Sequence, residues 1–529
     1  MSITRRTALK VIAGTVPALA LGRGLSAHPG LDIQTGPFVG TRESLQQYQV
    51  PEWFRDAKFG IWSHWGPQSA VEQGDWYARL MYIQGTRQYN YHVGHYGHPS
   101  KVGYKDLCPK WKGDEFDPEH LMALYKRAGA KYFVSMGVHH DAFDLWDSKH
   151  TRWNSVRVGP KKDIVGLWRK AATRQGLRFG VTEHLWISYK WFAVSHGSDK
   201  TGPLAGTAYD GADAANADLY GDAGCAKWAH EGDPSHPYDT EFAWNDEDVP
   251  DSWKLHWFNR LRDLVDNYSP DLLYTDGGLP FENYGASVVA NLYNQSAKAH
   301  GGQTQAVYTS KDAKDSAQGC CVLDIERGVA DQLRPAPWQT DTCIGEWHYY
   351  RDLYEKHQYK SPKKLIDMLV DIVSQNGNLL LSIPLPNSGQ PDPDELEILA
   401  AISDWMKVNG EGIHGTRPWK IYGEGPGTRA AKPAAEFNED ERKPLTADDV
   451  RFTIKGNALY AFVMDWPGKE ALVPALGTGS PQQPPKISNV ELLGHEAGLK
   501  WTQEASGLRV PLPPEKPCNF AVALKVIFQ

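Results

Sequence analysis

The chain has 529 residues and a net charge of −8, with 56 Lys and Arg against 64 Asp and Glu. This length exceeds one ordinary domain, so we expect two domains and a leader. The charge is spread along the chain without long basic runs, which argues against nucleic acid and acidic membranes as partners. The six cysteines show neither the framework of a small disulfide-rich domain nor metal-ligand spacing, and we interpret the one adjacent pair, Cys320 and Cys321, as structural.

The first thirty residues have the pattern of an export signal. The run 4–10 (TRRTALK) resembles a twin-arginine signal, an apolar stretch follows at 11–21, and Ser26 and Ala27 offer a cleavage site. The apolar stretch is too short to span a membrane, and no run of about eighteen apolar residues occurs elsewhere. We therefore predict that residues 1–30 direct export to a bacterial periplasm or beyond it.

From residue 58 to residue 383 the pattern alternates between helix and strand. The first predicted strand is 58–63, which ends on His64. Four helix–strand pairs follow, with helices at 117–129, 163–176, 252–267 and 361–375 and strands at 131–138, 177–182, 271–275 and 378–383. Asp, Ser or Pro at the starts and Gly at the ends are the usual helix boundaries, and Gly377 is the predicted stop of the last helix. Strict alternation predicts a parallel sheet, in the α/β class of a (β/α)8 TIM barrel.

Two stretches interrupt this alternation. Residues 197–251 are rich in Gly, Asp and Ala, and we expect them either to form a wall over a functional site or to be family decoration. Residues 300–344 are predicted to be irregular. After about Pro418 short alternating runs appear at 450–454, 458–465, 487–493 and 519–527, separated by Gly and Pro clusters. We therefore expect a barrel over 31–417 and an antiparallel β-sandwich over 418–529, which packs on the barrel or binds carbohydrate.

Polar residues follow three of the predicted strands. Asp276 ends one strand and precedes two glycines, so a buried strand would hold its carboxylate rigidly, as a nucleophile or base requires; a turn aspartate is the alternative. His139 and His140 end another strand, and neutral imidazoles there would bind sugar hydroxyls. Adjacent strand residues point to opposite faces, so the alternative is one packing and one surface histidine. With no H-E-x-x-H pattern, we predict no metal site.

A glycosidase would need a second carboxyl group, which lies about 5–5.5 Å from the first in retaining enzymes. The residues after Asp276 offer seven, among which spacing does not choose: Asp312, Asp315, Asp324, Glu326, Asp331, Asp341 and Glu346. Other chemistries lack their motifs, because the chain has no G-x-S-x-G elbow, phosphate loop or dinucleotide fingerprint. Twenty Trp and twenty-four Tyr indicate either a large core or aromatic faces that stack on sugars.

Several ordered segments together identify a family. Residues 58–66 (KFGIWSHWG) resemble K-F-G-x-F-x-H-W-G, 75–77 (DWY) resemble E-W-Y, and 139–148 (HHDAFDLWDS) resemble H-H-D-G-F-x-L-W-x-S. Residues 376–381 (NGNLLL) resemble N-G-N-L-L-L. These are motifs of the α-L-fucosidases of glycoside hydrolase family 29, and the resemblance runs from Trp53 to Pro384. It implies a retaining, exo-acting hydrolase of terminal α-L-fucosyl residues on oligosaccharides or glycoconjugates, without a metal or organic cofactor.

The resemblance also implies roles for individual residues. Asp276 matches the nucleophile, and Glu326 falls where other members have the general acid/base, with Glu346 as the second choice. The residues that match fucose-binding positions are His64, Trp76, His139 and His140.

Among the departures from the family pattern, Ala142 in place of a glycine should matter little, and three others bear on the site. Asp75 replaces a glutamate, so a hydrogen bond from its carboxylate to a sugar hydroxyl needs a closer backbone. His184 stands where many members have a Tyr-Ser pair, and we expect it to contact the sugar. Gln339 follows Trp338 where many members have Trp-Glu, and glutamine cannot donate a proton. If Glu326 is not the acid, Gln339 favours a non-catalytic fucose-binding protein; a barrel glycosidase for another sugar, such as galactose, is a further alternative.

Overall fold

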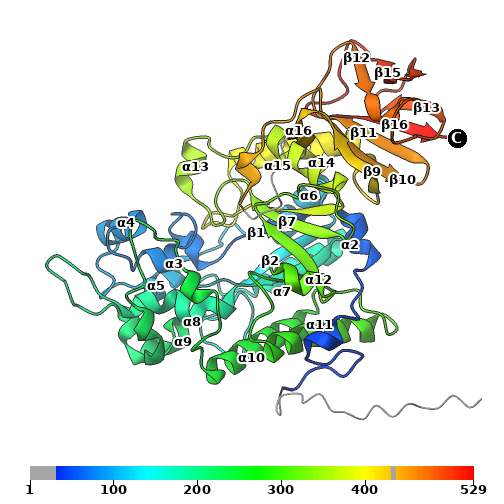
Figure 1. Ribbon diagram of the computed structural model, residues 1–529. Coiled ribbons are helices and arrows are strands. Elements are labelled where there is room, and N and C mark those ends of the chain that lie inside the picture. Colours follow the sequence, from blue (N-terminus) through cyan, green and yellow to red (C-terminus); the bar gives the residue numbers. More distant parts are fainter. Residues whose placement is uncertain (1–30, 430–436) are drawn as a thin grey trace, which may run out of the picture.

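The computed structural model describes residues 31–429 and 437–529, so the predicted export signal lies outside the described residues. Eight parallel strands close into a barrel in chain order, with β1 paired to both β2 and β8 (Figure 1). The strands are β1 Phe59–Ser63, β2 Tyr132–Val138, β3 Arg178–Glu183, β4 Leu272–Thr275, β5 Val307–Ser310, β6 Val322–Glu326, β7 Trp338–Cys343 and β8 Gly377–Ser382. The predicted fold class is confirmed.

Long helices surround the barrel, and their starts follow the predicted capping residues. Asp117, Asp163 and Ser361 each accept a hydrogen bond from a backbone N–H of the first helical turn. Gly176 ends its helix in the left-handed conformation, at φ 72°. The long helices are α6 Pro118–Arg127, α7 Ile164–Gln175, α10 Asp251–Tyr268, α11 Asn283–Ala299, α14 Pro362–Ser374 and α15 Pro393–Asn409.

Two predictions about this part of the chain are wrong. The stretch 300–344 contains three barrel strands, β5 to β7, because short strands that carry polar side chains into the barrel give no continuous apolar run. Gly377 does not stop α14 but begins β8. The left-handed residue between them is Asn376, at φ 74°, since asparagine tolerates this conformation better than most residues.

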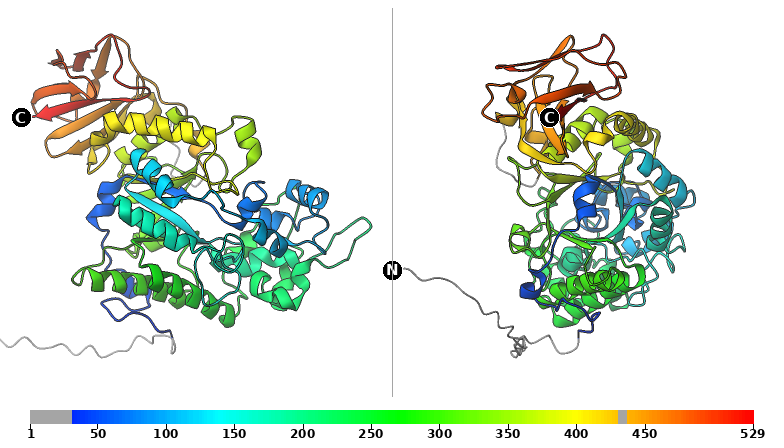
Figure 2. Two further views of the ribbon diagram at one scale, coloured as in Figure 1. Left: turned by 180° about the vertical axis from the view of Figure 1, so that it is seen from behind. Right: turned by 90° about the vertical axis from the view of Figure 1, so that its right-hand side faces the viewer.

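Short helices at the carboxyl end of the barrel come from the connections after β1 and after β3. They lie side by side in Figures 1 and 2, and the hydroxyls of Tyr82 and Tyr220 are 3.0 Å apart across their contact. The first group contains α3 Tyr77–Leu80, α4 Arg87–His95 and α5 Tyr104–Leu107, and the second α8 Ser188–Trp191 and α9 Ala217–Tyr220. The remaining short helices are α1 Arg42–Leu45, α2 Glu52–Ala57, α12 Ala313–Ala317, α13 Arg351–Glu355 and α16 Pro426–Arg429.

The C-terminal region is antiparallel, in a five-stranded sheet of order β13-β16-β11-β10-β9 and a three-stranded sheet of order β12-β15-β14. Four strands match the predicted runs: β10 Val450–Lys455, β11 Ala458–Val463, β13 Ile487–Leu492 and β16 Val522–Phe528. Four others were not predicted: β9 Arg417–Glu424, β12 Glu470–Val473, β14 Thr502–Glu504 and β15 Gly507–Pro511.

Alternation along β11 joins this region to the barrel. Leu459 and Ala461 lie in the core between the two sheets, whereas Tyr460 and Phe462 lie in the core shared with the barrel. Figure 2 shows the sheets seated beside α14 and α15. The buried Arg451 of β10 forms an ion pair there with Asp371 of α14. Within the described ranges, no helix has the length and apolar character to cross a membrane.

Candidate active site

A pocket of about 640 Å³ opens at the carboxyl ends of the barrel strands. All nine predicted site residues line it: His64, Asp75, Trp76, His139, His140, His184, Asp276, Glu326 and Glu346. They lie at the ends of six different barrel strands or in the connections that follow them, so only the closed parallel sheet brings them together.

Asp276 lies directly after β4 and is 7% exposed. Its Oδ2 is 3.0 Å from Nδ1 of His184 and 3.2 Å from Nε2 of His140, and its Oδ1 is 2.5 Å from Nζ of Lys311. Gly277 follows at φ 123°, and a Cβ atom there would lie 2.7 Å from the Trp186 ring. Glycine therefore lets the chain turn against Trp186, whose indole N–H donates to the Asp276 carbonyl at 2.6 Å.

Sequence reasoning missed Lys311, the residue after β5. Its ammonium group donates to Oδ1 of Asp276 and also to Oε2 of Glu326, and its side chain is 9% exposed. A lysine after a strand that was itself not predicted gave no signal, because most lysines lie on the surface. One buried cation therefore joins the two carboxyl groups.

The surroundings of these two carboxyl groups shift their pKa values in opposite directions. Burial alone would raise the pKa of Asp276, but the charge of Lys311 and hydrogen bonds from His184 and His140 hold it well below its usual value. Burial raises the pKa of Glu326 to about 8, against the lowering effect of Lys311. At neutral pH Asp276 is therefore a carboxylate while Glu326 is mostly a protonated acid, a pairing suited to a nucleophile and a general acid.

Glu326, the last residue of β6, contacts Lys311, which also contacts Asp276, whereas Glu346 does not contact Lys311 within the described part of the chain. The Oε1 of Glu326 accepts a hydrogen bond from the indole of Trp347 at 3.2 Å. The Oε2 of Glu346 accepts from the backbone N–H of Asp75 at 3.1 Å, and no contact joins Glu346 to Asp276 or Lys311 among the described residues. The geometry therefore favours Glu326 over Glu346 as the partner of Asp276.

Four of the other five acidic candidates have structural partners, and the fifth, Asp331, does not line the pocket. The side chain of Asp312 caps α12, and Asp315 forms an ion pair with Arg42. Asp324 and Asp341 are buried on β6 and β7, where their carboxylates accept hydrogen bonds from Gln339 at 2.8 Å and Tyr274 at 2.8 Å, respectively. Asp341 also lines the pocket, but its neighbour Gln339 is fully buried and does not. Gln339 therefore does not occupy the position of an acid in this pocket.

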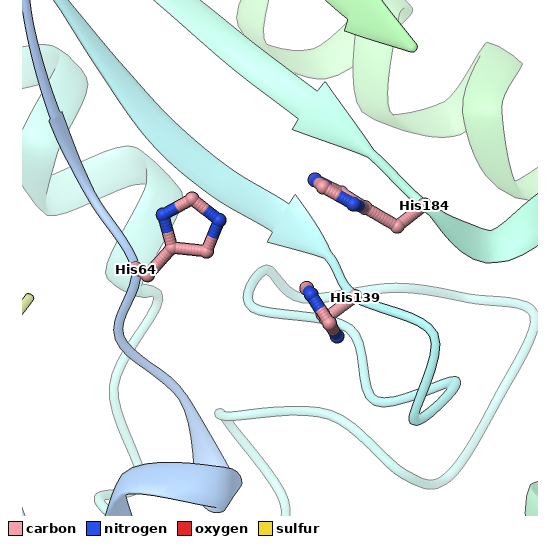
Figure 3. A group of neighbouring side chains, drawn as sticks. All are labelled: His64, His139 and His184. Atoms are coloured by element: carbon pink, nitrogen blue, oxygen red, sulfur yellow. The ribbon is translucent and has the colours of Figure 1, made fainter. Parts of the chain in front are cut away.

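Three of the histidines that line the pocket lie close to one another (Figure 3). His64, His139 and His184 follow β1, β2 and β3, respectively. Their Nδ1 atoms bond Ser382 at 2.9 Å, Gln68 at 2.9 Å and Asp276 at 3.0 Å. These bonds fix the rings, and Nε2 of His184 has no partner among the described residues. Each of the three rings is thus anchored in the pocket through one of its nitrogens.

His139 and His140 both line the pocket because β2 has already ended at Val138. The alternative of one surface histidine is therefore excluded. Burial lowers the pKa of His64 and His139 well below the usual value, and that of His184 to about 4, so these rings are neutral at neutral pH. Neutral imidazoles can both donate hydrogen bonds to hydroxyls and accept them.

The same groups have the composition of a metal site. One nitrogen from each of His64, His139 and His184 lies within 4.8 Å of the others, and two further sets meet this limit: Asp75, His139 and His348, and His140, His184 and Asp276. These residues could hold a transition-metal ion. In the two sets that contain a carboxylate, Asp276 already bonds His184 and Asp75 already bonds His348. These carboxylates therefore have partners without a metal ion.

Asp75 and Trp76 form the side of the pocket next to these histidines. The Oδ1 of Asp75 is 2.5 Å from Nδ1 of His348, a partner that the sequence did not indicate. Trp76 has the left-handed φ of 57°, and its ring meets His140 edge-on at 5.8 Å. The strained backbone therefore turns the Trp76 ring toward the pocket.

Residues outside the barrel elements complete the pocket. Tyr238, Thr240 and Trp244 come from the stretch 197–251, so this stretch does form a wall over the site, the first of its two expected roles. Phe437 comes from the segment that precedes β10 in the C-terminal region. The segment that contains Phe437 carried no signal in the sequence that linked it to the pocket.

A closed (β/α) barrel with a carboxylate, a buried carboxylic acid and neutral imidazoles at its carboxyl end has the arrangement expected of a glycoside hydrolase. The chain belongs to the α-L-fucosidase family. The family model described as Alpha-L-fucosidase matches residues 27–411, and the one described as Alpha-L-fucosidase C-terminal domain matches residues 442–527.

Individual relatives agree with this assignment. The chain is 27% identical to the tissue alpha-L-fucosidase of Rattus norvegicus over 496 residues, which cover 90% of this chain and 89% of the relative. Against the tissue alpha-L-fucosidase of Homo sapiens it is 27% identical over 500 residues, covering 91% and 90%. The crystal structure of Thermotoga maritima alpha-fucosidase has the same fold, with a TM-score of 0.67 at 23% identity over 93% of this chain and 100% of that one.

Proposed function

We propose that the protein is a retaining, exo-acting α-L-fucosidase that hydrolyses terminal α-L-fucosyl residues of oligosaccharides or glycoconjugates. The observation that carries this proposal is the single ammonium group of Lys311 in contact with both Asp276 and Glu326. Because Oδ1 of Asp276 and Oε2 of Glu326 both accept hydrogen bonds from Nζ of Lys311, these two oxygens lie within about 6 Å of each other. Retaining glycosidases separate their carboxyl groups by about 5–5.5 Å and inverting enzymes by about 6.5–9.5 Å, so this arrangement supports retention.

In the first step a carboxylate oxygen of Asp276 attacks the anomeric carbon of fucose. The bond from that carbon to the leaving oxygen breaks, and its electron pair takes the proton of Glu326. The charge of Asp276 disappears into the ester while a new charge forms on Glu326. Because Lys311 contacts both groups, its ammonium stabilises the anion on either side of this step.

In the second step Glu326 takes a proton from water as the water attacks the anomeric carbon. The ester bond breaks, Asp276 regains its charge, and fucose leaves in its original α configuration. His64, His139, His140 and His184 hold the sugar hydroxyls, with Asp75 and Trp76 beside them. No step of this mechanism calls on a metal or an organic cofactor.

The alternatives find less support. The hypothesis of a non-catalytic fucose-binding protein applied if Glu326 is not the acid and Gln339 occupies the position of the acid. Gln339 is buried and does not line the pocket. A panel of 4-nitrophenyl glycosides tests both alternatives, with the α-L-fucoside expected to be hydrolysed and the galactosides not. Proton NMR recorded early in the reaction should show that the fucose is released as the α anomer. Release of the β anomer, or hydrolysis of a galactoside alone, would contradict the proposal.

We also propose that residues 1–30 export the protein, that 31–417 form the catalytic domain and that 418–529 form the sandwich. The six cysteines support export in a folded state, because all are free thiols and five are buried, so the fold does not depend on disulfides. Cell fractionation of the full chain and of an Arg5→Lys, Arg6→Lys variant tests export. The variant should remain in the cytoplasm; equal export of both would overturn this part of the proposal.

A further inference from the structure

Three aromatic side chains are exposed on the described part of the chain, and all three line the pocket. Tyr238 is 55% exposed, Trp244 37% and Phe437 60%. The other large exposed hydrophobic side chains of the described residues are aliphatic, and none of them lines the pocket. Leaving large aromatic surfaces in water is unfavourable, so their collection at one mouth indicates a ligand that covers them.

Two of these side chains are held on the side of the pocket that the stretch 197–251 forms. The Trp244 ring meets the edges of Trp186 at 5.8 Å and His140 at 5.9 Å, and its N–H donates to Thr240 at 3.1 Å. The Tyr238 ring packs on Trp76 at 5.5 Å. Both rings therefore extend the aromatic wall outward from the residues that surround the sugar.

The third aromatic residue is attached to the strand end that carries the acid. The backbone N–H of Phe437 donates to the carbonyl of Glu326 at 2.8 Å, and that of Glu439 donates to the carbonyl of Arg327 at 3.0 Å. The buried carboxylate of Glu439 then accepts from Arg327 at 2.8 Å, Thr342 at 2.6 Å and Lys360 at 2.9 Å. Phe437 is therefore fixed beside Glu326.

The side of the pocket beside the acid is where the leaving group must lie, because Glu326 protonates the leaving oxygen. On the basis of the proposed function, we propose that Tyr238, Trp244 and Phe437 form a binding site for the sugar ring of the leaving group. The apolar C–H face of a pyranose would stack on these rings, as it does on aromatic side chains in general. Arg327 and Glu346 also line the pocket and offer a donor and an acceptor to its hydroxyls. The preferred substrate is then a fucosylated saccharide, rather than a fucoside of a small alcohol.

The test compares two substrates that differ in the leaving group. Fluoride in α-L-fucosyl fluoride is too small to reach the aromatic residues, whereas α-L-fucosyl-(1→2)-galactose or a related fucosyl disaccharide covers them. The measured quantity is the ratio of kcat/KM on the disaccharide to kcat/KM on the fluoride. Phe437→Ala and Trp244→Ala should each lower this ratio at least tenfold, and Phe437→Tyr should restore most of it. Leu472→Ala, which removes an exposed side chain of the sandwich, is the matched control and should leave the ratio unchanged.

A ratio that stays within twofold of wild type in both alanine variants would overturn the inference, as would an equal loss on both substrates. The variants lie on separate segments, so misfolding of one, detected by circular dichroism, leaves the other as the test. If the wild-type protein hydrolyses neither substrate, the proposed function itself fails. Turnover of the fluoride with an unchanged ratio would refute only the leaving-group site.

Discussion

The Nζ atom of Lys311 lies 2.5 Å from Oδ1 of Asp276, and the same ammonium contacts Glu326. In this arrangement the cation lowers the pKa of both carboxyl groups, while burial acts against it. At Glu326 the effect of burial is larger, so its pKa is raised. At Asp276 the charge of Lys311 and the hydrogen bonds from His184 and His140 together have the larger effect, so its pKa is lowered. The difference in protonation on which the proposed reaction depends therefore comes from position rather than from residue type.

Replacement of Asp276 by alanine should abolish the covalent route. We expect kcat/KM on 4-nitrophenyl α-L-fucoside to fall on the order of 10⁴-fold or more. Added azide should restore turnover and give β-fucosyl azide, since azide can attack from the face that the carboxylate vacates. Asp404→Ala, on the exposed side of α15, is the control and should match wild type. Activity of Asp276→Ala within tenfold of wild type would exclude Asp276 as the nucleophile.

The pH profile should have an alkaline limb that belongs to Glu326. The proton donor is present below its pKa, so kcat/KM should hold below pH 8 and decline as the pH rises through about 8. Glu326→Gln should remove this limb and reduce the rate most on natural glycosides, whose leaving groups need the proton. A limb that survives in Glu326→Gln but disappears in Glu346→Gln would assign the acid to Glu346.

Removal of the shared cation should move both limbs of the profile in one direction. Lys311 lowers the pKa of Asp276 and of Glu326, so Lys311→Met should raise both. The acidic limb, which reports Asp276, would then move up to a pH at which kcat/KM can be measured. The alkaline limb, which reports Glu326, would move to a higher pH than in wild type. Lys311→Arg keeps the charge and should keep the profile closer to wild type. Limbs that move in opposite directions, or remain in place, would contradict the assigned coupling.

Restoring the family's glutamate at Gln339 should harm the fold without adding an acid. The Gln339 amide donates to Asp324 and accepts from the Tyr132 hydroxyl, both in the barrel interior. Glutamate would add another buried carboxyl group beside Asp324, whose own pKa is already raised well above its usual value by burial and by the neighbouring Asp341. We expect the free energy of unfolding to fall by about 3 kcal/mol, measured by thermal and urea denaturation. Gln46→Glu, at an exposed position, should have little effect; a Gln339→Glu protein as stable as wild type would refute this reading.

The sequence predicted the elements whose apolar runs and capping residues agree. Strands β1 to β4 and β8 each contain a short apolar run, and Asp276 could be identified because it follows one of them directly. Strand β5 has only four residues, two of them polar, and was missed. Strands β6 and β7 were missed because Asp324, Gln339 and Asp341 point polar groups into a barrel that satisfies them with hydrogen bonds. Such compensation depends on strands distant in the sequence, so a local pattern does not contain it.

The same limit applies to the candidate site. The histidines at strand ends could be predicted because the end of a strand is a local feature. Lys311 lies after a strand that was missed, and His348 pairs with Asp75 across 273 positions. Phe437 reaches the pocket from the C-terminal region through a backbone hydrogen bond, which depends on no side-chain type. These residues required the three-dimensional arrangement.

The link between residues 437–439 and the end of β6 has a consequence for how this protein can be divided. A shortened protein that stops after α15 would keep every barrel strand, yet the peptide groups of Glu326 and Arg327 would each lose a bonding partner. Glu326, the proposed proton donor, would then end a strand that has lost this hydrogen-bonded support. The C-terminal region thus supports the end of β6, where the proposed acid lies. Gene fusions or truncations intended to preserve turnover should therefore retain this region.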